Sequence, residues 1–406
     1  MPRGFFWLLS AQFVSGLADN ALLIVAIALL PGWGLPPWVA PLLKLSFTLA
    51  YVGLAPLVSA LADAAPKGRV MMAGNALKAV GLLGLMAGLH PLVAFAVIGL
   101  GAALYAPAKY GLATELAPAA RLVAANGWLE VTMVGAILLG TVAGGGLSVP
   151  AWLARALPVV LAMYMLAAVL NLGVPRSARQ PVPLPRPLAE LPRRLWRQFL
   201  GAQRTLWKDR EGALSLAATT LFWGAGATMQ FAVLRWATER LGLTLDRAAL
   251  LQAVVAVGVV AGAAVAGRWV QLRTARRVLP CGVALGLLVP VVALTDSVAW
   301  AVPLLVAVGA LGGALVVPMN ALLQHRGVQL LSPGQSIAVQ NFNENASVLA
   351  MLAVYAALGA LQLPLLPLMT GFGLAVAAVS AVLVSWSAAG AGSGSRPAAA
   401  GRWPGR

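Results

Sequence analysis

The sequence predicts an all-α polytopic membrane protein with twelve transmembrane helices arranged as two bundles of six. Three features predict this fold class: a very apolar composition, twelve apolar runs long enough to cross a bilayer, and basic residues that gather in one set of loops. No soluble fold class accounts for the three features together.

The composition favours a membrane protein over a soluble one. Of the 406 residues, 61% are hydrophobic and 10% are charged. A soluble domain is about 45–50% apolar and about 25% charged, so the soluble enzyme classes are largely excluded. The net charge of +17 would suggest nucleic acid in a soluble protein, but basic cytoplasmic loops explain it here, and we expect no nucleic-acid partner. With one cysteine, Cys281, and two histidines, we expect no disulfide, metal or cofactor.

Apolar runs of roughly 20 residues, each sufficient to cross the hydrocarbon core, recur along the whole chain. The first run contains Asp19 and Asn20 and is too long and too polar for a removable signal peptide, so we expect it to remain as a span. The predicted spans are residues 5–30, 39–62, 70–89, 92–116, 122–147, 151–174, 212–238, 247–270, 277–295, 298–323, 334–360 and 363–387.

The charges of the loops predict the orientation. An even number of spans puts both termini on one side, and that side receives 21 of the 28 lysines and arginines. The opposite side receives four, which are Lys44, Arg155, Arg240 and Arg247. Because basic loops are retained in the cytoplasm, we expect both termini to be cytoplasmic.

A basic segment after the sixth span divides the chain. We expect an N-terminal six-helix bundle at 1–174, a cytoplasmic linker at 175–211, a C-terminal six-helix bundle at 212–388 and a disordered, Gly/Ala/Ser-rich tail at 389–406. The first part of the linker is Pro-rich and is expected to be extended. The second part, residues 188–207, either lies as a basic amphipathic helix on anionic headgroups or is a solvated connection that holds the orientation.

The two halves show weak internal similarity, as the repeats of transporters do. LGAALYAPAK in the fourth span aligns with LGGALVVPMN in the tenth, which pairs Lys109 with Asn320. NGWLE in the fifth span aligns with QNFNE in the eleventh, which pairs Glu130 with Glu344. The second half therefore keeps the carboxylate, as Glu344, and has Asn320 in place of the basic Lys109.

Ionisable and amide side chains lie inside the predicted spans. A charge near the bilayer centre costs at least roughly 2.5–3.5 kcal/mol, so such residues usually face a cavity and have a function. Structural alternatives remain: Asp19 as the partner of a neighbouring helix, Lys109 as a lysine that snorkels to the interface, and the amides as interhelical hydrogen bonds. The candidate binding residues are Asp19, Asn20, Lys109, Asn126, Glu130, Gln340, Asn341, Glu344 and Asn345.

The loop LADAAPKGRVMM after the second span resembles the signature of the major facilitator superfamily, whose fold has six plus six spans. Its charged residues Asp63, Lys67 and Arg69 are expected to form a cytoplasmic gate. A carboxylate at a helix end, near the N-terminus of a neighbouring helix and basic partners, can latch that side. GAILLGTVAGG in the fifth span resembles the Gly-rich motif of the superfamily without its usual proline, and small residues there let helices approach closely.

Several strings resemble a narrower family within this superfamily, the bacterial lysophospholipid transporters. They include AQFVSGLADNALL, KGRVMMAGNALK, YAPAKYG, VVPMNALLQHRG and SIAVQNFNEN, and they keep their order over nearly the whole chain. The resemblance implies import of lysophosphatidylethanolamine and related lysolipids across a bacterial inner membrane by alternating access, with membrane lipids around it and a separate acyltransferase that reacylates the product. Family members carry an arginine where this chain has Gln230, so no charge role is carried over to span seven.

The candidate residues suit a zwitterionic lysolipid. A phosphate needs a cation such as Lys109, an ammonium needs a carboxylate such as Glu344, and hydroxyls need amides. The main alternative is a proton-coupled transporter of another small amphiphile, with Asp19 or Glu130 as proton carrier. An intramembrane acyltransferase is disfavoured because the chain has no HxxxxD-type pair and no nucleophile–base set, so we expect no enzyme activity. A scaffold without transport would not explain the intramembrane charges.

Overall fold

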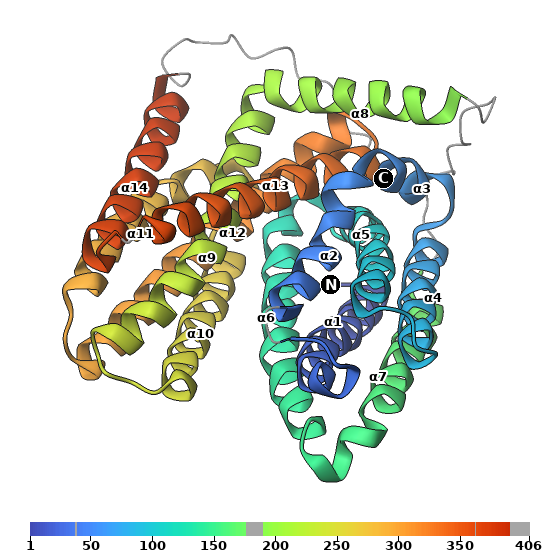
Figure 1. Ribbon diagram of the computed structural model, residues 1–406. Coiled ribbons are helices and arrows are strands. Elements are labelled where there is room, and N and C mark those ends of the chain that lie inside the picture. The colour runs from blue at the N-terminus through green and yellow to red at the C-terminus, as the bar shows by residue number, and fades with distance from the viewer. Residues whose placement is uncertain (37–38, 176–189, 362, 390–406) are drawn as a thin grey trace, which may run out of the picture.

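The computed structural model describes residues 1–36, 39–175, 190–361 and 363–389, and these residues fold into fourteen α-helices joined by short turns (Figure 1). The Pro-rich part of the predicted linker, 176–189, and nearly all of the predicted tail lie outside the described residues. The helices of the first half are α1 (Arg3–Leu29), α2 (Ala40–Gly53), α3 (Ala55–Ala64), α4 (Lys67–Met86), α5 (Pro91–Leu116), α6 (Leu122–Leu147) and α7 (Pro150–Leu170).

The second half begins with α8 (Leu191–Lys208), which corresponds to the predicted amphipathic segment and confirms that it is helical. The remaining helices are α9 (Arg210–Glu239), α10 (Leu245–Trp269), α11 (Pro280–Leu294), α12 (Val298–Leu330), α13 (Pro333–Ala360) and α14 (Leu365–Ala389). Each of the twelve predicted spans coincides with one of these helices, except that the second is divided at Leu54 into α2 and α3, which are bent by 68°.

Within the described residues, nine helices are long and apolar enough to cross a membrane, and the bent pair α2–α3 would be a tenth. The long helices α9 and α13 fall outside this set. Both carry many polar residues; α13 alone contains Gln340, Asn341, Asn343, Glu344 and Asn345. The structure thus supports a multi-pass membrane protein. Helix length and apolarity identify nine or ten of the twelve predicted spans.

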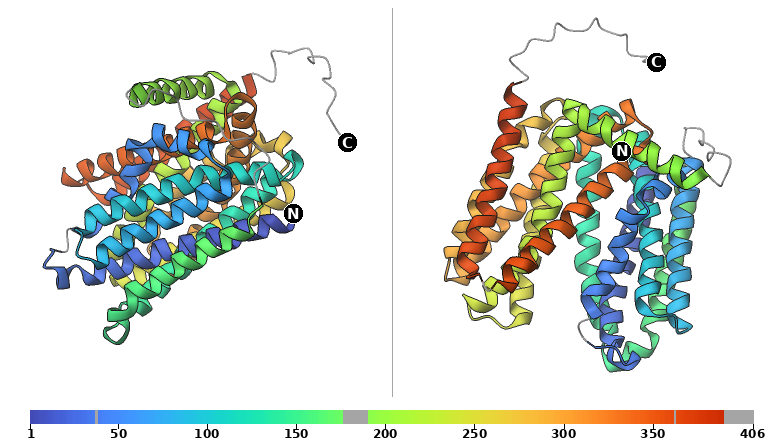
Figure 2. Two further views of the ribbon diagram at one scale, coloured as in Figure 1. Left: turned by 90° about the vertical axis from the view of Figure 1, so that its right-hand side faces the viewer. Right: turned by 45° about the horizontal axis from the view of Figure 1, so that its top comes forward.

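The helices form two groups, α1–α7 and α9–α14, and α8 lies across one end of both (Figures 1 and 2). We call this the basic end, because the helix ends and turns there carry Lys67, Arg69, Arg121, Arg268, Arg273, Arg276, Arg277 and Arg326. The two groups pack together near the basic end and diverge toward the opposite end, the far end (Figure 2).

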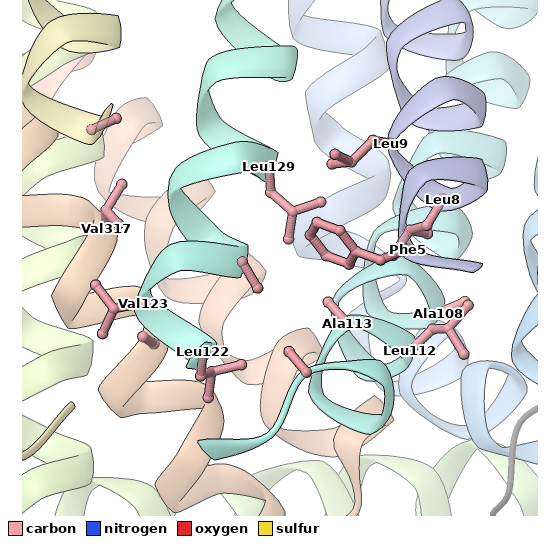
Figure 3. Packing of buried hydrophobic residues seen from close by; sticks show 14 of the residues in the cluster. Phe5, Leu8, Leu9, Ala108, Leu112, Ala113, Leu122, Val123, Leu129 and Val317 are labelled. Carbon is pink, nitrogen blue, oxygen red and sulfur yellow. The ribbon is translucent and has the colours of Figure 1, made fainter. Parts of the chain in front are cut away.

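Apolar packing follows the same pattern. A cluster near the basic end joins the groups: Phe5, Leu9 and Leu129 pack in the first group, and Val123 lies toward Val317 of α12 (Figure 3). Nearer the far end, each group has a separate core, one around Leu22, Leu43 and Tyr164 and another around Trp236 and Leu305. The basic end is therefore the place where the groups are held together.

Small residues allow two helix pairs to pack with their backbones in contact. A Cβ atom at Gly140 or Gly144 of the predicted Gly-rich motif would lie 2.6 or 2.7 Å from a backbone oxygen of α1. Between α10 and α12 the packing is closer still: a Cβ atom at Gly262 would lie 1.9 Å from the backbone oxygen of Ala310, and one at Gly313 would lie 2.2 Å from that of Val259. These contacts require glycine on steric grounds.

An ion-pair network ties the start of α9 to α12 at the basic end. Asp209 caps α9 by accepting a hydrogen bond from the Gly212 backbone N–H at 2.8 Å, and it pairs with the Arg326 guanidinium. Hydrogen bonds from Arg326 hold the pKa of the Asp209 carboxyl below its ordinary value. Arg276 pairs in the same way with Glu211, so the second group is braced independently of the first.

Candidate functional site

A cavity of about 220 Å³ lies inside the first group, lined by residues of α1, α2, α4, α5 and α6. Its charged lining residues are Asp19, Lys44, Lys78 and Lys109. Three lysines against one aspartate give this cavity a positive balance, which suits an anionic group.

Asp19 of α1 is held by side chains of two other helices. Its carboxylate accepts a hydrogen bond from Lys78 Nζ of α4 at 2.6 Å and another from the Tyr164 hydroxyl of α7 at 2.8 Å. Lys78 also donates to the Ser15 hydroxyl at 2.9 Å, and Ser15 donates to Asn75 Oδ1 at 2.7 Å. The sequence indicated Asp19 but did not reveal Lys78 as its partner, because 59 residues separate the two.

Two lysines of the cavity have no carboxylate partner within 4 Å in the described part of the chain. Lys109 is 8% exposed, and its Nζ lies 4.2 Å from the ring centroid of Tyr110. Lys109 forms no ion pair with Glu130, although the two groups are close enough for their charges to interact. Lys44, counted from the sequence among the basic residues of the outer side, lies within α2 and lines the cavity.

The cavity also contains polar atoms without partners. Among the described residues, Gln12 Oε1 and the Tyr105 hydroxyl are buried and form no hydrogen bond. The Gln12 amide is nevertheless oriented, because its Nε2 donates to the Leu129 carbonyl at 2.9 Å and to Thr132 Oγ1 at 2.8 Å. Buried polar groups are almost always paired, so these two atoms are available to a ligand or to water.

A second polar cluster lies on α13 and its neighbour α12. Gln340 Nε2 donates to Asn320 Oδ1 and to Glu344 Oε1, both at 2.8 Å. Asn345 Nδ2 donates to the Asn341 carbonyl at 2.8 Å, while the Asn341 side-chain nitrogen is buried without a partner. The cluster thus presents a carboxylate, held by the Gln340 amide and the Thr219 hydroxyl, and an Asn341 amide nitrogen that has no partner among the described residues.

Glu130 of α6 is near members of both polar regions. It is 4% exposed, and its charge interacts with those of Lys109 and Glu344. The structure therefore brings Asp19, Asn20 and Lys109 together around the cavity and sets Glu130 near both Lys109 and the cluster of α13 residues Gln340, Asn341, Glu344 and Asn345.

Asn126 is the candidate that the structure locates elsewhere. Its side chain forms a reciprocal amide pair with Gln324 of α12, at 2.9 and 2.8 Å. The pair is buried and joins the two helix groups near the basic end. Asn126 lies one turn before Glu130 on α6, but the packing of α6 against α12 directs its amide to the boundary between the two helix groups.

The gate motif forms the contact that its chemistry predicts. Asp63, at the end of α3, accepts hydrogen bonds from the Ser332 hydroxyl at 2.5 Å, the Gly334 backbone N–H at 3.1 Å and Lys67 Nζ at 2.6 Å. Ser332 is the N-cap of α13, so a carboxylate of the first group caps a helix of the second. Arg69, the third predicted gate residue, is exposed and takes no part in these described contacts.

Sequence reasoning missed several residues of these sites, chiefly Lys44, Lys78, Tyr164, Gln324 and Ser332. Two of them had a readable signal: Ser332, because SPGQ is a capping box at the start of α13, and Lys78, because it is a lysine inside the third predicted span. The others depend on which helices become neighbours.

The family model described as Major Facilitator Superfamily matches residues 8–360. Proteins named "Lysophospholipid transporter LplT" from Yersinia pestis (strain Pestoides F) and from Yersinia pseudotuberculosis serotype O:3 (strain YPIII) are 44% identical over 359 residues, which cover 87% of this chain and 86% of each relative.

Solved structures with the same architecture include a bacterial homologue of the iron transporter ferroportin in the outward-facing state, with a TM-score of 0.73 at 18% identity, covering 95% of this chain and 100% of that one. The transporter FucP in the outward conformation gives a TM-score of 0.72 at 15% identity, covering 95% and 97%. At such low identities these two structures show the fold alone.

Proposed function

This chain belongs to the lysophospholipid transporters of the major facilitator superfamily, and from this we propose that it moves lysophosphatidylethanolamine and related lysolipids from the outer leaflet of a bacterial inner membrane to its cytoplasmic side. The observation that carries the proposal is a cavity with two ammonium groups that have no carboxylate partner among the described residues, near buried carboxylates on α6 and α13. A small polar molecule with separated negative and positive charges fits this arrangement.

We assign the headgroup as follows. The phosphate binds Lys109, with Lys44 as a first contact nearer the far end; the ammonium binds Glu344 and Glu130. A hydroxyl or ester oxygen of the lysolipid accepts a hydrogen bond from the Tyr105 hydroxyl, and a lysolipid hydroxyl donates one to Gln12 Oε1. These bonds would pair the two cavity atoms that have no partner among the described residues. The acyl tail lies along the apolar walls.

The membrane arrangement of the proposal has twelve spans, with both termini and the basic end in the cytoplasm. Exposed tryptophans support two interfacial levels: Trp269 and Trp386 near the basic end, Trp152 and Trp300 near the far end. The polar helices α9 and α13 count as spans because their polar faces would line the path. The units are then 1–174, 175–211, 212–388 and 389–406.

Transport proceeds by alternating access, from a state closed at the basic end. Asp63 with Ser332, and Asn126 with Gln324, join the two groups at that end. Opening this end while closing the far end would release the lysolipid to the cytoplasmic side, where a separate acyltransferase reacylates it. The transporter itself makes and breaks no covalent bond.

Uptake of radiolabelled lysophosphatidylethanolamine into spheroplasts that express the protein tests the function. We expect saturable uptake whose initial rate is unaffected by a protonophore, because product removal draws import forward. Absence of uptake above that of empty-vector spheroplasts would contradict the proposal. Collapse of the initial rate with the protonophore would favour the alternative, a proton-coupled transporter of amphiphiles.

Glu344→Gln tests the ammonium site. The substitution keeps an oxygen that can accept from Gln340 but removes the charge. A charge-assisted hydrogen bond is worth about 1.5–3 kcal/mol, so uptake of lysophosphatidylethanolamine is expected to fall roughly 10- to 100-fold. Lysophosphatidylglycerol, which lacks the ammonium, serves as the matched substrate and is expected to lose far less; equal losses for both would refute the assignment.

Lys44→Ala tests the outer phosphate contact. Lys44 has no ion-pair partner among the described residues and lines the cavity, so its removal is expected to raise KM about three- to tenfold with little change in the maximal rate. Lys44→Arg is the control that keeps the charge and should keep KM close to the parent value. An unchanged KM in Lys44→Ala would show that Lys44 only snorkels toward the interface.

A further inference from the structure

Helix α8 has three distinct faces, and the proposed transport cycle uses none of them. Leu195, Phe199, Ala202 and Leu206 are at most 4% exposed and form one face. The other two faces are exposed, and they differ in chemistry.

The buried face of α8 holds both helix groups. It packs against Ala55 of α3 in the first group and against Leu216, Leu323, Ala338 and Val339 in the second. Phe199 meets Phe342 of α13 edge-on, with ring centroids 5.3 Å apart, and Gln203 accepts a hydrogen bond from Asn343 at 3.0 Å. While α8 is seated, it therefore bridges the two groups across their closed end.

The second face is apolar and largely exposed, although the Trp196 ring also meets Phe199 of the buried face edge-on, with ring centroids 6.1 Å apart. Trp196, Leu200 and Trp207 are 44%, 49% and 44% exposed. At 100° per residue, these three positions fall within about 40° of one another, so they form a single stripe along the helix. An exposed stripe of two tryptophans and a leucine is costly in water and suits the boundary between headgroups and acyl chains.

The third face is basic and borders the stripe. Arg193, Arg197, Arg204 and Lys208 project within about 60° of one another, on the side of the stripe away from the buried face. All four are exposed. A row of cations beside an apolar stripe is the arrangement that binds anionic phospholipid, since the cations meet phosphates while the apolar residues enter the interface.

The position of α8 places this stripe at the level of the bilayer surface. The residue that opens the next helix, Arg210, donates a hydrogen bond to the Trp386 carbonyl at 2.5 Å. Trp386 is itself 40% exposed near the end of α14, where an interfacial tryptophan is expected. The helix lies across the ends of the spans, rather than extending away from them (Figures 1 and 2).

We propose that α8 is a lipid-bound clamp: anionic phospholipid of the leaflet at the basic end binds the stripe and its adjoining cations, and this binding keeps the buried face seated across both helix groups. The abundance of anionic lipid in that leaflet then controls how readily the basic end opens. An acidic soluble protein or a second copy of this chain would occupy the same face without any dependence on lipid.

A fluorescent probe tests the lipid contact. Cys281 is the only cysteine, so Cys281→Ser provides a background in which Leu200→Cys reports the stripe and Gln198→Cys, about 160° away and exposed, is the matched control. The labelled proteins are reconstituted into phosphatidylcholine vesicles with or without phosphatidylglycerol. We expect phosphatidylglycerol to shift the Leu200→Cys emission to the blue and protect it from iodide, with no change at Gln198→Cys. Equal iodide quenching at both positions in both lipids would overturn the proposal.

A thiol beneath the helix tests the clamp. Val339 is fully buried under α8. Val339→Cys is made in the Cys281→Ser background, and the cysteine side chain is smaller than the valine side chain, so it fits the same space. Its reaction with a membrane-impermeant maleimide is expected to slow when phosphatidylglycerol is added, and Arg197→Gln with Arg204→Gln should abolish that slowing. A labelling rate that is independent of lipid would overturn the coupling, and protection that depends on protein concentration instead would identify a second copy.

Discussion

Asp19→Asn is expected to abolish transport, with the initial rate of lysophosphatidylethanolamine uptake falling by more than about 100-fold. The carboxylate pairs with Lys78 Nζ at 2.6 Å and accepts from Tyr164 at 2.8 Å, and Lys78 is 2% exposed. Removing one member of a buried ion pair costs about 3–5 kcal/mol because the remaining charge is left buried without a partner. The same change removes the only carboxylate that lines the cavity among the described residues.

A double variant separates the contribution of Asp19 to stability from its role in transport. Asp19→Asn with Lys78→Gln removes both charges and is expected to restore thermal stability in detergent toward that of the parent protein, while uptake stays lost. Recovery of normal uptake in the double variant would show that the pair is purely structural. Substantial uptake in Asp19→Asn alone would refute a role of Asp19 in the cavity.

Asp63→Asn is expected to open the basic end and to reduce uptake roughly 10- to 100-fold. Asp63 accepts hydrogen bonds from Ser332 and from the Gly334 backbone, both across the boundary between the helix groups, and each bond to a charged group is worth about 1.5–3 kcal/mol. The loss therefore destabilises the state closed at that end, whereas Lys67 remains with its hydrogen bond to the Ala62 carbonyl at 2.9 Å.

The reaction of Val339→Cys with an impermeant maleimide, in the Cys281→Ser background, measures this opening directly. We expect Asp63→Asn to accelerate the labelling and Ser332→Ala to do so less, since the Gly334 backbone N–H remains available to Asp63. Arg69→Ala is the matched control, because Arg69 is exposed and lies outside the described contacts of Asp63. Normal uptake and unchanged labelling in Asp63→Asn would show that the capped contact does not latch the end.

The sequence predicted well those features that depend on local pattern. Apolar runs located the helices of all twelve predicted spans, including the bent pair α2–α3. A helix that crosses the hydrocarbon core needs about 20 consecutive apolar residues, and such a run can be recognised from the segment alone. Residues 188–207 left open whether an amphipathic helix or a solvated connection forms, and α8 is the helix. The contact of Asp63 with a helix N-terminus followed from the motif and from the chemistry of an unsatisfied helix end.

Features that depend on which helices meet could not be predicted. Lys78 completes the Asp19 site only because α4 packs near α1, and one sequence without an alignment contains no signal for that pairing. Asn126 lies one turn before Glu130 on α6, yet its amide forms hydrogen bonds with Gln324 of α12. Lys44 was counted only as a charge on the outer side, because its place near the start of the second span did not reveal that α2 borders a cavity.

The contact between α10 and α12 restricts how this protein can change through mutation. Gly258, Gly262, Gly309 and Gly313 each face a backbone oxygen of the opposite helix at a distance that leaves no room for a methyl group. In a library of single substitutions, alanine at these four positions would be as harmful as a large residue, while exposed apolar positions such as Val257 would accept many side chains. Helices α10 and α12 would then move as one rigid unit. Substitutions that change the properties of the transporter therefore have to accumulate in other helices.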